Sequence, residues 1–310
     1  MLQWLQKFEK KRTLPVQPEQ VNKDLLASLM IMAWFVEAKD PYTGGHLWRV
    51  SRYANLLCRA GGLPEADIAR ITLGGFLHDL GKVAIPDSIL NKRGKLDENE
   101  FAIIKTHPEA GGRLLAGHPL RHIVAAAVEL HHERPDGGGY PYGLNASMIP
   151  IDAAIIGICD AFDAMTSLRS YRSPMPVEKA LNIMREECGK QFNQFWCEQF
   201  LALAEQNLLN DIMGHSDNGI PLHTCPLCGP TVLQQRDNKP GDLLACSVCY
   251  SEMELCTEHG YLTVKPTGNK ASAAQLQPKA DNLLIKQLIE ESIGHIPLEQ
   301  VIQFSSHKNQ

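Results

Sequence analysis

The chain has 310 residues, enough for one large domain and a small additional module. Its formal net charge is −5, so its composition gives no sign of a polymeric nucleic acid or an anionic membrane as the main partner. We find no apolar run of the roughly 20 residues that a membrane-spanning helix needs, and no secretory signal. A reduced, cytoplasmic protein without a transmembrane segment is therefore expected.

Helical periodicity dominates the first two thirds of the chain. Residues 1–20 are predicted to form a lead-in helix and linker, and we favour packing on its own domain over binding to a membrane surface. Strand patterns are almost absent before residue 210, which predicts an all-α domain over 21–213. Its helices are expected at 21–38, from 46, at 65–82, from 97 toward 107, and at 109–116, 120–132, 151–167, 176–189 and 194–209, with loops at 85–95 and 137–141.

The sequence pattern changes from helical to β-type after Gly214. Short β-type segments surround two Cys-x-x-Cys pairs, which predicts a small β-rich module over 214–265. Residues 266–280 contain few large apolar groups and are predicted to be a linker. A short amphipathic helix is expected at 283–293, so residues 266–310 form a linker and a C-terminal helix.

Several imidazoles and carboxylates lie beside helix ends or in apolar segments of the helical domain. Each one alone is typical of a helix cap or a buried core histidine. Together they indicate a metal centre, because imidazole and carboxylate ligands suit iron, manganese, zinc or nickel. Seven ligands exceed the needs of one tetrahedral ion, which predicts two ions. The candidates are His46, His78, Asp79, His107, His131, His132 and Asp160.

The motifs around these ligands resemble the HD-GYP subgroup of the HD-domain phosphohydrolases. The resemblance spans about residues 30–200 and is carried by five segments, at 40–46, 77–82, 106–108, 131–141 and 160–167. It implies an HD-type helical bundle that hydrolyses cyclic di-GMP to pGpG, GMP or both. It also implies a pair of transition-metal ions, iron or manganese, that activate the attacking water.

The resemblance also assigns roles to single residues. The seven candidates above match metal ligands, and Asp79, with two oxygens to share, is expected to bridge the ions. Lys82 would stabilise charge on the scissile phosphate, as the second catalytic residue beside Asp79 and as a substrate contact. Further substrate contacts are expected from Tyr140, Arg169 and Arg172. Asp40 and Asp163 would orient ligand imidazoles.

One position departs from the family pattern. Some members have Glu where this chain has Tyr42, four residues before His46, and that Glu can hold a third metal. Tyr42 is a poor ligand for such a site, so a centre with two ions is predicted.

The Cys-rich module has the spacing of a structural zinc site. Cys225 and Cys228 form one pair, Cys246 and Cys249 the other, with 17 residues between the pairs. Four thiolates would close a tetrahedron around one zinc ion, and metal binding would supply folding energy to so small a unit. A redox dithiol is the less favoured alternative. His223, Cys256 and His259 are spare ligands, so the fourth ligand stays open.

Three functions remain in competition. The leading one is a cyclic di-GMP phosphodiesterase. The second is a phosphohydrolase of another cyclic dinucleotide or nucleotide, and the third is a catalytically idle signalling module that binds a nucleotide. A protein partner for the zinc-ribbon-like module and a homodimer are further alternatives.

Overall fold

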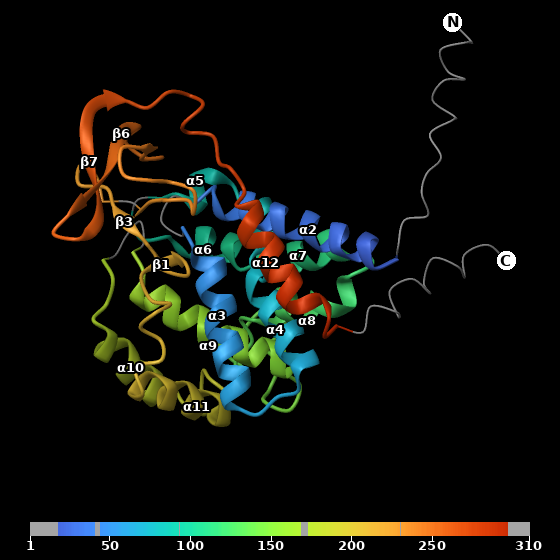
Figure 1. Ribbon diagram of the computed structural model, residues 1–310. Helices are drawn as coiled ribbons and strands as arrows, with labels where there is room; N and C mark the ends of the chain where they lie inside the picture. Colours follow the sequence, from blue (N-terminus) through green and yellow to red (C-terminus); the bar gives the residue numbers. More distant parts are fainter. Residues whose placement is uncertain (1–17, 41–43, 93, 169–172, 230, 297–310) are drawn as a thin grey trace, which may run out of the picture.

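The computed structural model describes residues 18–40, 44–92, 94–168, 173–229 and 231–296. Its first part is a helical bundle (Figure 1), and the first strand of the described residues begins at His215, as the all-α prediction requires. None of the described helices is long and apolar enough to span a membrane. The helices of the bundle are α2 (Pro18–Glu37), α3 (His46–Ala60), α4 (Glu65–Leu77), η1 (Leu80–Ala84), α5 (Asp87–Leu90), α6 (Glu98–Ile104), α7 (His107–Leu115), α8 (Arg121–Leu130), α9 (Ile151–Thr166), α10 (Val177–Glu186) and α11 (Gln194–Glu205).

Helix α3 is the central element of the bundle. It packs against α2, α4, α9 and α11, and its side chains are buried on nearly every side. Tyr53 meets the rings of Phe162 and Phe200 edge to face, with centroids 5.5 and 6.1 Å apart. Aromatic packing of this kind fixes the rotation of a helix about its axis. Because His46 is the first residue of α3, the core also fixes the position of this imidazole.

The prediction of one helix over 65–82 was wrong. Helix α4 ends at Leu77, and a separate 3₁₀ helix, η1, begins at Leu80. The break places η1 against α7: a Cβ on Gly81 would lie 1.8 Å from the His107 carbonyl oxygen. A continuous α-helix could not turn toward α7 here. The predicted loop over 85–95 also contains a short helix, α5, and the helix predicted from 97 ends at Ile104, before α7 starts.

We expect Gly81→Ala to lower the free energy of unfolding by about 3 kcal/mol, because the added methyl overlaps backbone atoms that cannot rotate away. Besides the His107 oxygen, that methyl would lie 2.6 Å from the Gly111 nitrogen. Urea denaturation measures the loss. Gly117→Ala is the matched control, since no described atom lies within 4 Å of its added Cβ. Equal stability of the two variants would show that the close approach is wrong.

The second part of the chain forms three small antiparallel sheets beside the bundle (Figure 1). Strand β6 alternates buried and partly exposed residues, which is typical of a strand with one face on a core. That core is separate from the helical one and consists of Cys225, Val232, Leu244, Cys246, Met253, Leu255 and Val264. The strands are β1 (His215–Asp217) with β2 (Ile220–Pro221), β3 (His223–Thr224) with β4 (Thr231–Val232), and β5 (Leu243–Ala245) with β6 (Ser251–Glu258) and β7 (Tyr261–Lys270).

Two features of the C-terminal part differ from the predicted division at 265. Strand β7 continues to Lys270, which pairs with Ser251, so the first residues of the predicted linker belong to a sheet. Pro266 and Gly268 are residue types that are typical of loops. Because β7 is an edge strand of its sheet, proline is tolerated there. Helix α12 (Asn282–Ile293) packs on α2 and α4 and adds apolar side chains to the helical core. The chain therefore returns to the first domain after the module.

Candidate metal centre

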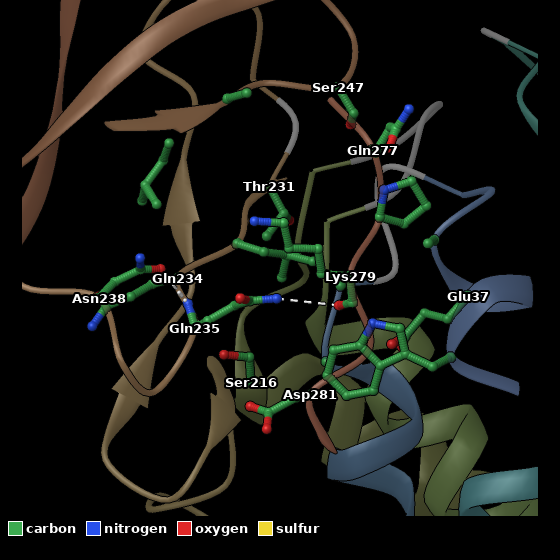
Figure 2. Close-up of a pocket in the computed structure, with 18 of the residues that line it drawn as sticks. Glu37, Ser216, Thr231, Gln234, Gln235, Asn238, Ser247, Gln277, Lys279 and Asp281 are labelled. Atoms are coloured by element: carbon green, nitrogen blue, oxygen red, sulfur yellow. Dashed lines mark hydrogen bonds between the residues drawn. The ribbon is translucent and has the colours of Figure 1, made fainter. Parts of the chain in front are cut away.

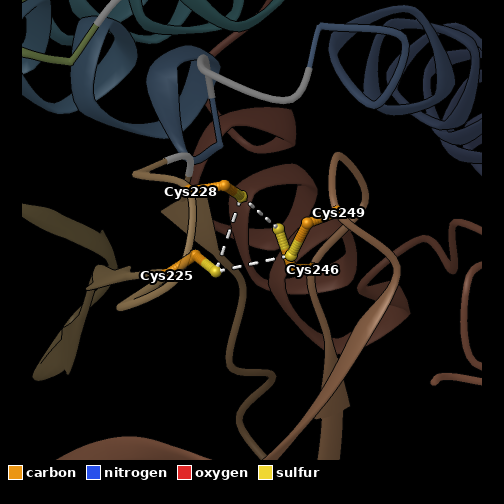
Figure 3. A group of neighbouring side chains, drawn as sticks. All are labelled: Cys225, Cys228, Cys246 and Cys249. Carbon is orange, nitrogen blue, oxygen red and sulfur yellow. Dashed lines mark hydrogen bonds between the residues drawn. The ribbon is translucent and has the colours of Figure 1, made fainter. Parts of the chain in front are cut away.

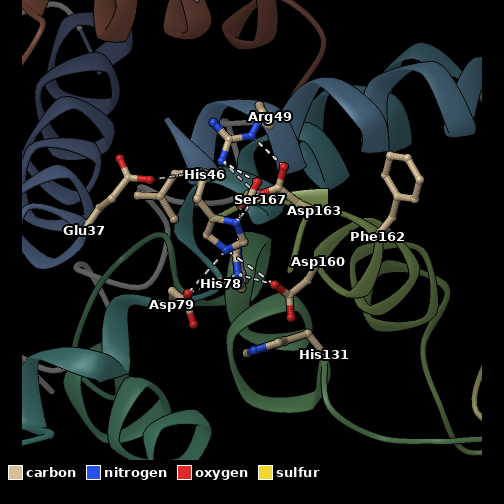
Figure 4. Close-up of polar contacts among 12 residues, drawn as sticks. Glu37, His46, Arg49, His78, Asp79, His131, Asp160, Phe162, Asp163 and Ser167 are labelled. Atoms are coloured by element: carbon tan, nitrogen blue, oxygen red, sulfur yellow. Dashed lines mark hydrogen bonds and ion pairs between the residues drawn. The ribbon is translucent and has the colours of Figure 1, made fainter. Parts of the chain in front are cut away.

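Helix ends deliver the candidate ligands to one buried region of the bundle. His46 opens α3 and His107 opens α7, while the pair His78–Asp79 follows α4 directly. His131 and His132 follow α8, and Asp160 projects from α9 (Figure 4). The ligand atoms form two groups, each with all atoms within 4.8 Å of one another. These groups are His46, His78 and Asp79, and His107, His131 and His132.

Backbone carbonyls fix the orientation of three of these imidazoles. The Nδ1 of His78 donates to the Gly75 oxygen at 2.7 Å, that of His107 to Ile104 and that of His131 to Ala127, both at 2.8 Å. A carbonyl oxygen can only accept a hydrogen bond, so Nδ1 carries the proton. In a neutral ring the lone pair then lies on Nε2 and points into the centre.

The Nε2 atoms of this centre fit a cation. Those of His107 and His131 are 3.3 Å apart, and two facing lone pairs repel each other unless a positive charge or a proton lies between them. The Nε2 atoms of His46 and His78 are buried and have no hydrogen-bond partner among the described residues. Buried polar atoms of this kind are normally satisfied. The donor set therefore suits divalent transition metals.

Asp79 lies between the two groups of ligands. Its Oδ2 is 3.4 Å from His78 Nε2 and 3.6 Å from His46 Nε2, and its Oδ1 is 3.5 Å from His107 Nε2. One oxygen thus faces each group, the geometry of a bridging carboxylate. Lys82 Nζ is 2.6 Å from Asp79 Oδ2. The lysine therefore lies beside the bridge, and it belongs to η1 rather than to the single helix predicted over 65–82.

Burial keeps three of the imidazoles neutral. It lowers the pKa of His107 to about 4 and that of His131 to about 3, although the Asp79 carboxylate opposes the shift. Burial also holds the pKa of His132 well below its usual range, and the neighbouring His131 acts in the same direction. Neutral imidazoles keep the lone pair that a metal requires.

His46 is surrounded by carboxylates. Its Nδ1 is 2.8 Å from Asp163 Oδ2, and its Nε2 is 3.4 Å from Asp160 Oδ1. Burial alone would lower its pKa, but the hydrogen bond to Asp163 and the nearby Asp79 and Asp160 carboxylates raise it to about 9. Asp163 lies in the position predicted for orienting an imidazole. Asp40, the other residue predicted to orient an imidazole, borders a cavity between the bundle and the sheets.

Sequence reasoning missed three charged residues around the centre, of which Arg49 and Glu133 are buried and Glu37 is partly buried. Arg49 binds the Asp163 carboxylate through Nε at 2.5 Å and Nη2 at 3.0 Å. Glu37 accepts a hydrogen bond from the Leu47 backbone. Glu133 follows the ligand pair 131–132 directly and accepts from the backbone of the next loop. The available signals were the position of Arg49 in an apolar segment and the position of Glu133 directly after the ligand pair.

The loop that carries Tyr140 lies over His132. The two rings stack with centroids 4.6 Å apart and an interplanar angle of 28°. Lys105 Nζ is 5.9 Å from the Tyr140 ring centroid. Tyr140 thus borders the metal centre, where the resemblance places a substrate contact. The predicted substrate residues Arg169 and Arg172, and Tyr42 with its bearing on the ion count, lie outside the described residues.

Glu133→Gln is expected to lower the free energy of unfolding by about 1–3 kcal/mol and to loosen the loop over 140–144. The buried carboxylate accepts from the Tyr142 nitrogen at 2.7 Å and the Leu144 nitrogen at 2.8 Å, and an amide can accept with one atom only. Urea denaturation measures the loss of stability, and hydrogen exchange of residues 140–144 measures the loosening of the loop. Glu178→Gln, in the exposed first turn of α10, is the control. Hydrogen exchange like that of the parent chain would mean that Glu133 does not hold the loop that borders the site.

The four predicted cysteines form a compact cluster (Figure 3). Cys228 Sγ is 3.6 Å from that of Cys225 and 3.5 Å from that of Cys246, and the Cys225 and Cys249 sulfurs are 3.8 Å apart. Zinc–sulfur bonds of about 2.3 Å in a tetrahedron place sulfurs about 3.8 Å apart. These cysteines are free thiols, not disulfides. The cluster therefore matches the geometry of a four-thiolate metal site.

The three other candidate zinc ligands lie outside the cluster of four cysteines. His223 Nε2 is 2.8 Å from the side-chain oxygen of Gln234, and the Cys256 thiol donates to the Thr263 carbonyl. His259 occupies the turn between β6 and β7 with a positive φ of 50°. The group of metal-ligand atoms found in this module consists of the four cysteines.

A helical bundle whose helix ends converge on buried histidines and aspartates is an HD-type domain. Residues 31–194, more than half of the chain, match the family described as HD domain. The chain belongs to the HD-domain family.

Several relatives are named as cyclic-dinucleotide phosphodiesterases. The chain is 41% identical over 168 residues to the cyclic di-GMP phosphodiesterase response regulator RpfG of Xanthomonas campestris, covering 54% of this chain and 44% of the relative. It is 40% identical to the 3′3′-cGAMP-specific phosphodiesterase 2 of Vibrio cholerae over 58% of this chain and 34% of the relative. It is 37% identical to a cyclic di-GMP phosphodiesterase of Thermotoga maritima, over 59% and 50%. The chain thus spans half or less of the length of these relatives.

Proposed function

We propose that the chain is an HD-GYP phosphodiesterase that hydrolyses cyclic di-GMP to pGpG, GMP or both. The observation that carries the proposal is the Asp79 carboxylate, which faces one group of buried imidazole nitrogens with each oxygen. The names of the relatives support the substrate class. Together they favour phosphodiester hydrolysis over a binding role alone.

Two ions of iron or manganese fit the donor set. One would be held by His46, His78 and Asp160, the other by His107, His131 and His132, and Asp79 would contact both. The chemistry that such a pair supplies is activation of water and neutralisation of charge on the phosphate.

The chain's own residues would bind and orient the substrate. Lys82 lies beside the Asp79 bridge, where an ammonium group can stabilise negative charge on a phosphate oxygen. Tyr140 offers a ring face at the edge of the centre for a base. Arg169 and Arg172 are proposed to hold phosphate oxygens by bidentate hydrogen bonds.

Turnover of cyclic di-GMP by the purified chain with added Mn²⁺ or Fe²⁺ tests the function. We expect pGpG or GMP as product, and no product after chelation. A fully metal-loaded chain that forms no product would favour the idle nucleotide-binding module. Faster turnover of 3′3′-cGAMP would favour the second candidate, which the name of the Vibrio relative supports.

The cysteine cluster is proposed to hold one structural zinc ion in a zinc-ribbon-like module. Its sulfur spacing supports zinc, and the closed thiolate set leaves no open position for catalysis. Free thiols are consistent with a cytoplasmic location. Exposed Leu227 and Tyr250, at the two Cys pairs, favour a protein partner over nucleic acid. A homodimer remains a separate candidate.

A further inference from the structure

The sheets of the cysteine module contact the bundle at the residues that directly precede the candidate ligand His46. Gly44 and Gly45 precede His46, and an added Cβ on Gly44 would lie 2.5 Å from the Leu233 side chain. On Gly45, whose φ is +73°, it would lie 2.6 Å from the Ser216 backbone. The module thus packs directly on the backbone of two glycines, which lie within two residues of the candidate ligand His46. Any displacement of the module must therefore change the surroundings of His46.

A buried guanidinium connects the module to that ligand. Arg49 Nη1 donates to the carbonyl of His215, the first residue of β1, and to that of Gly44, both at 2.9 Å. The other side of the guanidinium binds the Asp163 carboxylate, which in turn lies 2.8 Å from His46 Nδ1 (Figure 4). The chain of contacts runs from β1 through Arg49 and Asp163 to His46.

These contacts can transmit a change because their groups are buried. The side chain of Arg49 is only 1% exposed, so a lost partner is not replaced by water. Gly44, Gly45 and Ser216 also border a cavity of about 260 Å³ between the module and the bundle, which Glu37 and Gln235 help to line (Figure 2). A second contact joins the module to α12, where Arg236 Nη1 donates to the side-chain oxygen of Gln287 at 3.2 Å. Of these two contacts, the one through Gly44, Gly45 and Arg49 reaches a candidate ligand.

We propose that Arg49 is a positioning residue that couples the cysteine module to the metal centre. An ordered module holds the His215 carbonyl on Arg49, and Arg49 with Asp163 holds His46 in its ligand orientation. Metal binding at the four cysteines therefore tightens metal binding at the histidines and aspartates, and the reverse holds by linkage. This inference rests on the proposed metal centre.

The Mn²⁺ affinity of the full chain tests the coupling. The chain is purified in the presence of zinc, and its affinity for Mn²⁺ is measured by calorimetry. We expect Cys246→Ser and Arg49→Lys each to weaken Mn²⁺ binding about tenfold, within the usual range for partners that orient a ligand. Leu233→Ala should weaken it in the same direction, and Leu233 lies outside the module's buried core, so this variant stays informative if Cys246→Ser fails to fold. Hydrogen exchange of residues 44–50 should rise in all three variants.

Two controls and a double variant separate the outcomes. Arg59→Lys, on the exposed end of α3, and Tyr261→Ala, at the start of β7 and 79% exposed, should bind Mn²⁺ like the parent chain. If Arg49 carries the coupling, the double variant Cys246→Ser/Arg49→Lys should lose about as much affinity as either single variant. Parent-like affinity in both Cys246→Ser and Leu233→Ala would overturn the coupling. A parent chain that binds no Mn²⁺ would instead refute the proposed centre.

Discussion

Asp79→Asn should abolish hydrolysis of cyclic di-GMP while leaving the fold intact. Asparagine keeps the volume of the side chain but loses the charge and one of the two metal-binding oxygens. Loss of an outer partner of a metal ligand typically costs up to about 100-fold in affinity or activity, so loss of a direct bridge should cost at least that much. Product formation with saturating Mn²⁺ measures the effect, and circular dichroism checks the fold.

Asp67→Asn is the matched control for this variant. Asp67 lies on α4, the helix that ends two residues before Asp79, and its side chain is 37% exposed and paired with Arg70. We expect its turnover to equal that of the parent chain. Asp79→Asn with parent-like turnover and metal content would remove the basis of the bridging assignment.

Asp163→Ala should give the largest loss of stability among single substitutions around the centre. The buried carboxylate accepts two hydrogen bonds from Arg49 and lies 2.8 Å from His46 Nδ1. Its removal leaves a guanidinium without its counter-ion in the core, which typically costs about 3–5 kcal/mol. Urea denaturation of the metal-free chain at neutral pH isolates this term from metal binding.

Asp163→Asn and Glu65→Ala complete the test. Asparagine retains one acceptor for Arg49 and should lose less stability than alanine. Glu65 pairs with Arg59 at the surface, with both side chains about half exposed, so its removal should cost less than about 1 kcal/mol. A similar loss in Asp163→Ala and Glu65→Ala would contradict the account of the buried network.

The sequence indicated which residues would lie together in the fold, because histidines and aspartates are conspicuous in or beside apolar helical segments. The structure brings His46, His78, Asp79, His107, His131, His132 and Asp160 together. It also places the four cysteines at metal-ligand spacing. Local pattern sufficed because six of these seven ligands lie next to a helix boundary, and Asp160 is a carboxylate within the apolar helix α9.

Features that depend on tertiary contacts could not be predicted from local sequence patterns. The break between α4 and η1 follows from the approach of Gly81 to α7, which no local pattern contains. The amphipathic pattern of α12 predicted a helix but not its place on α2 and α4. Arg49 stands between Trp48 and Val50 in an apolar stretch, a signal of a buried cation, but its partners lie 114 and 166 residues away.

Anomalous diffraction from crystals of the Mn²⁺-loaded chain tests the central claim most directly. We predict two manganese peaks in the helical domain, one beside His46 and His78, the other beside His107 and His131, with an oxygen of Asp79 on each. A single peak, or two peaks without Asp79 between them, would contradict the account.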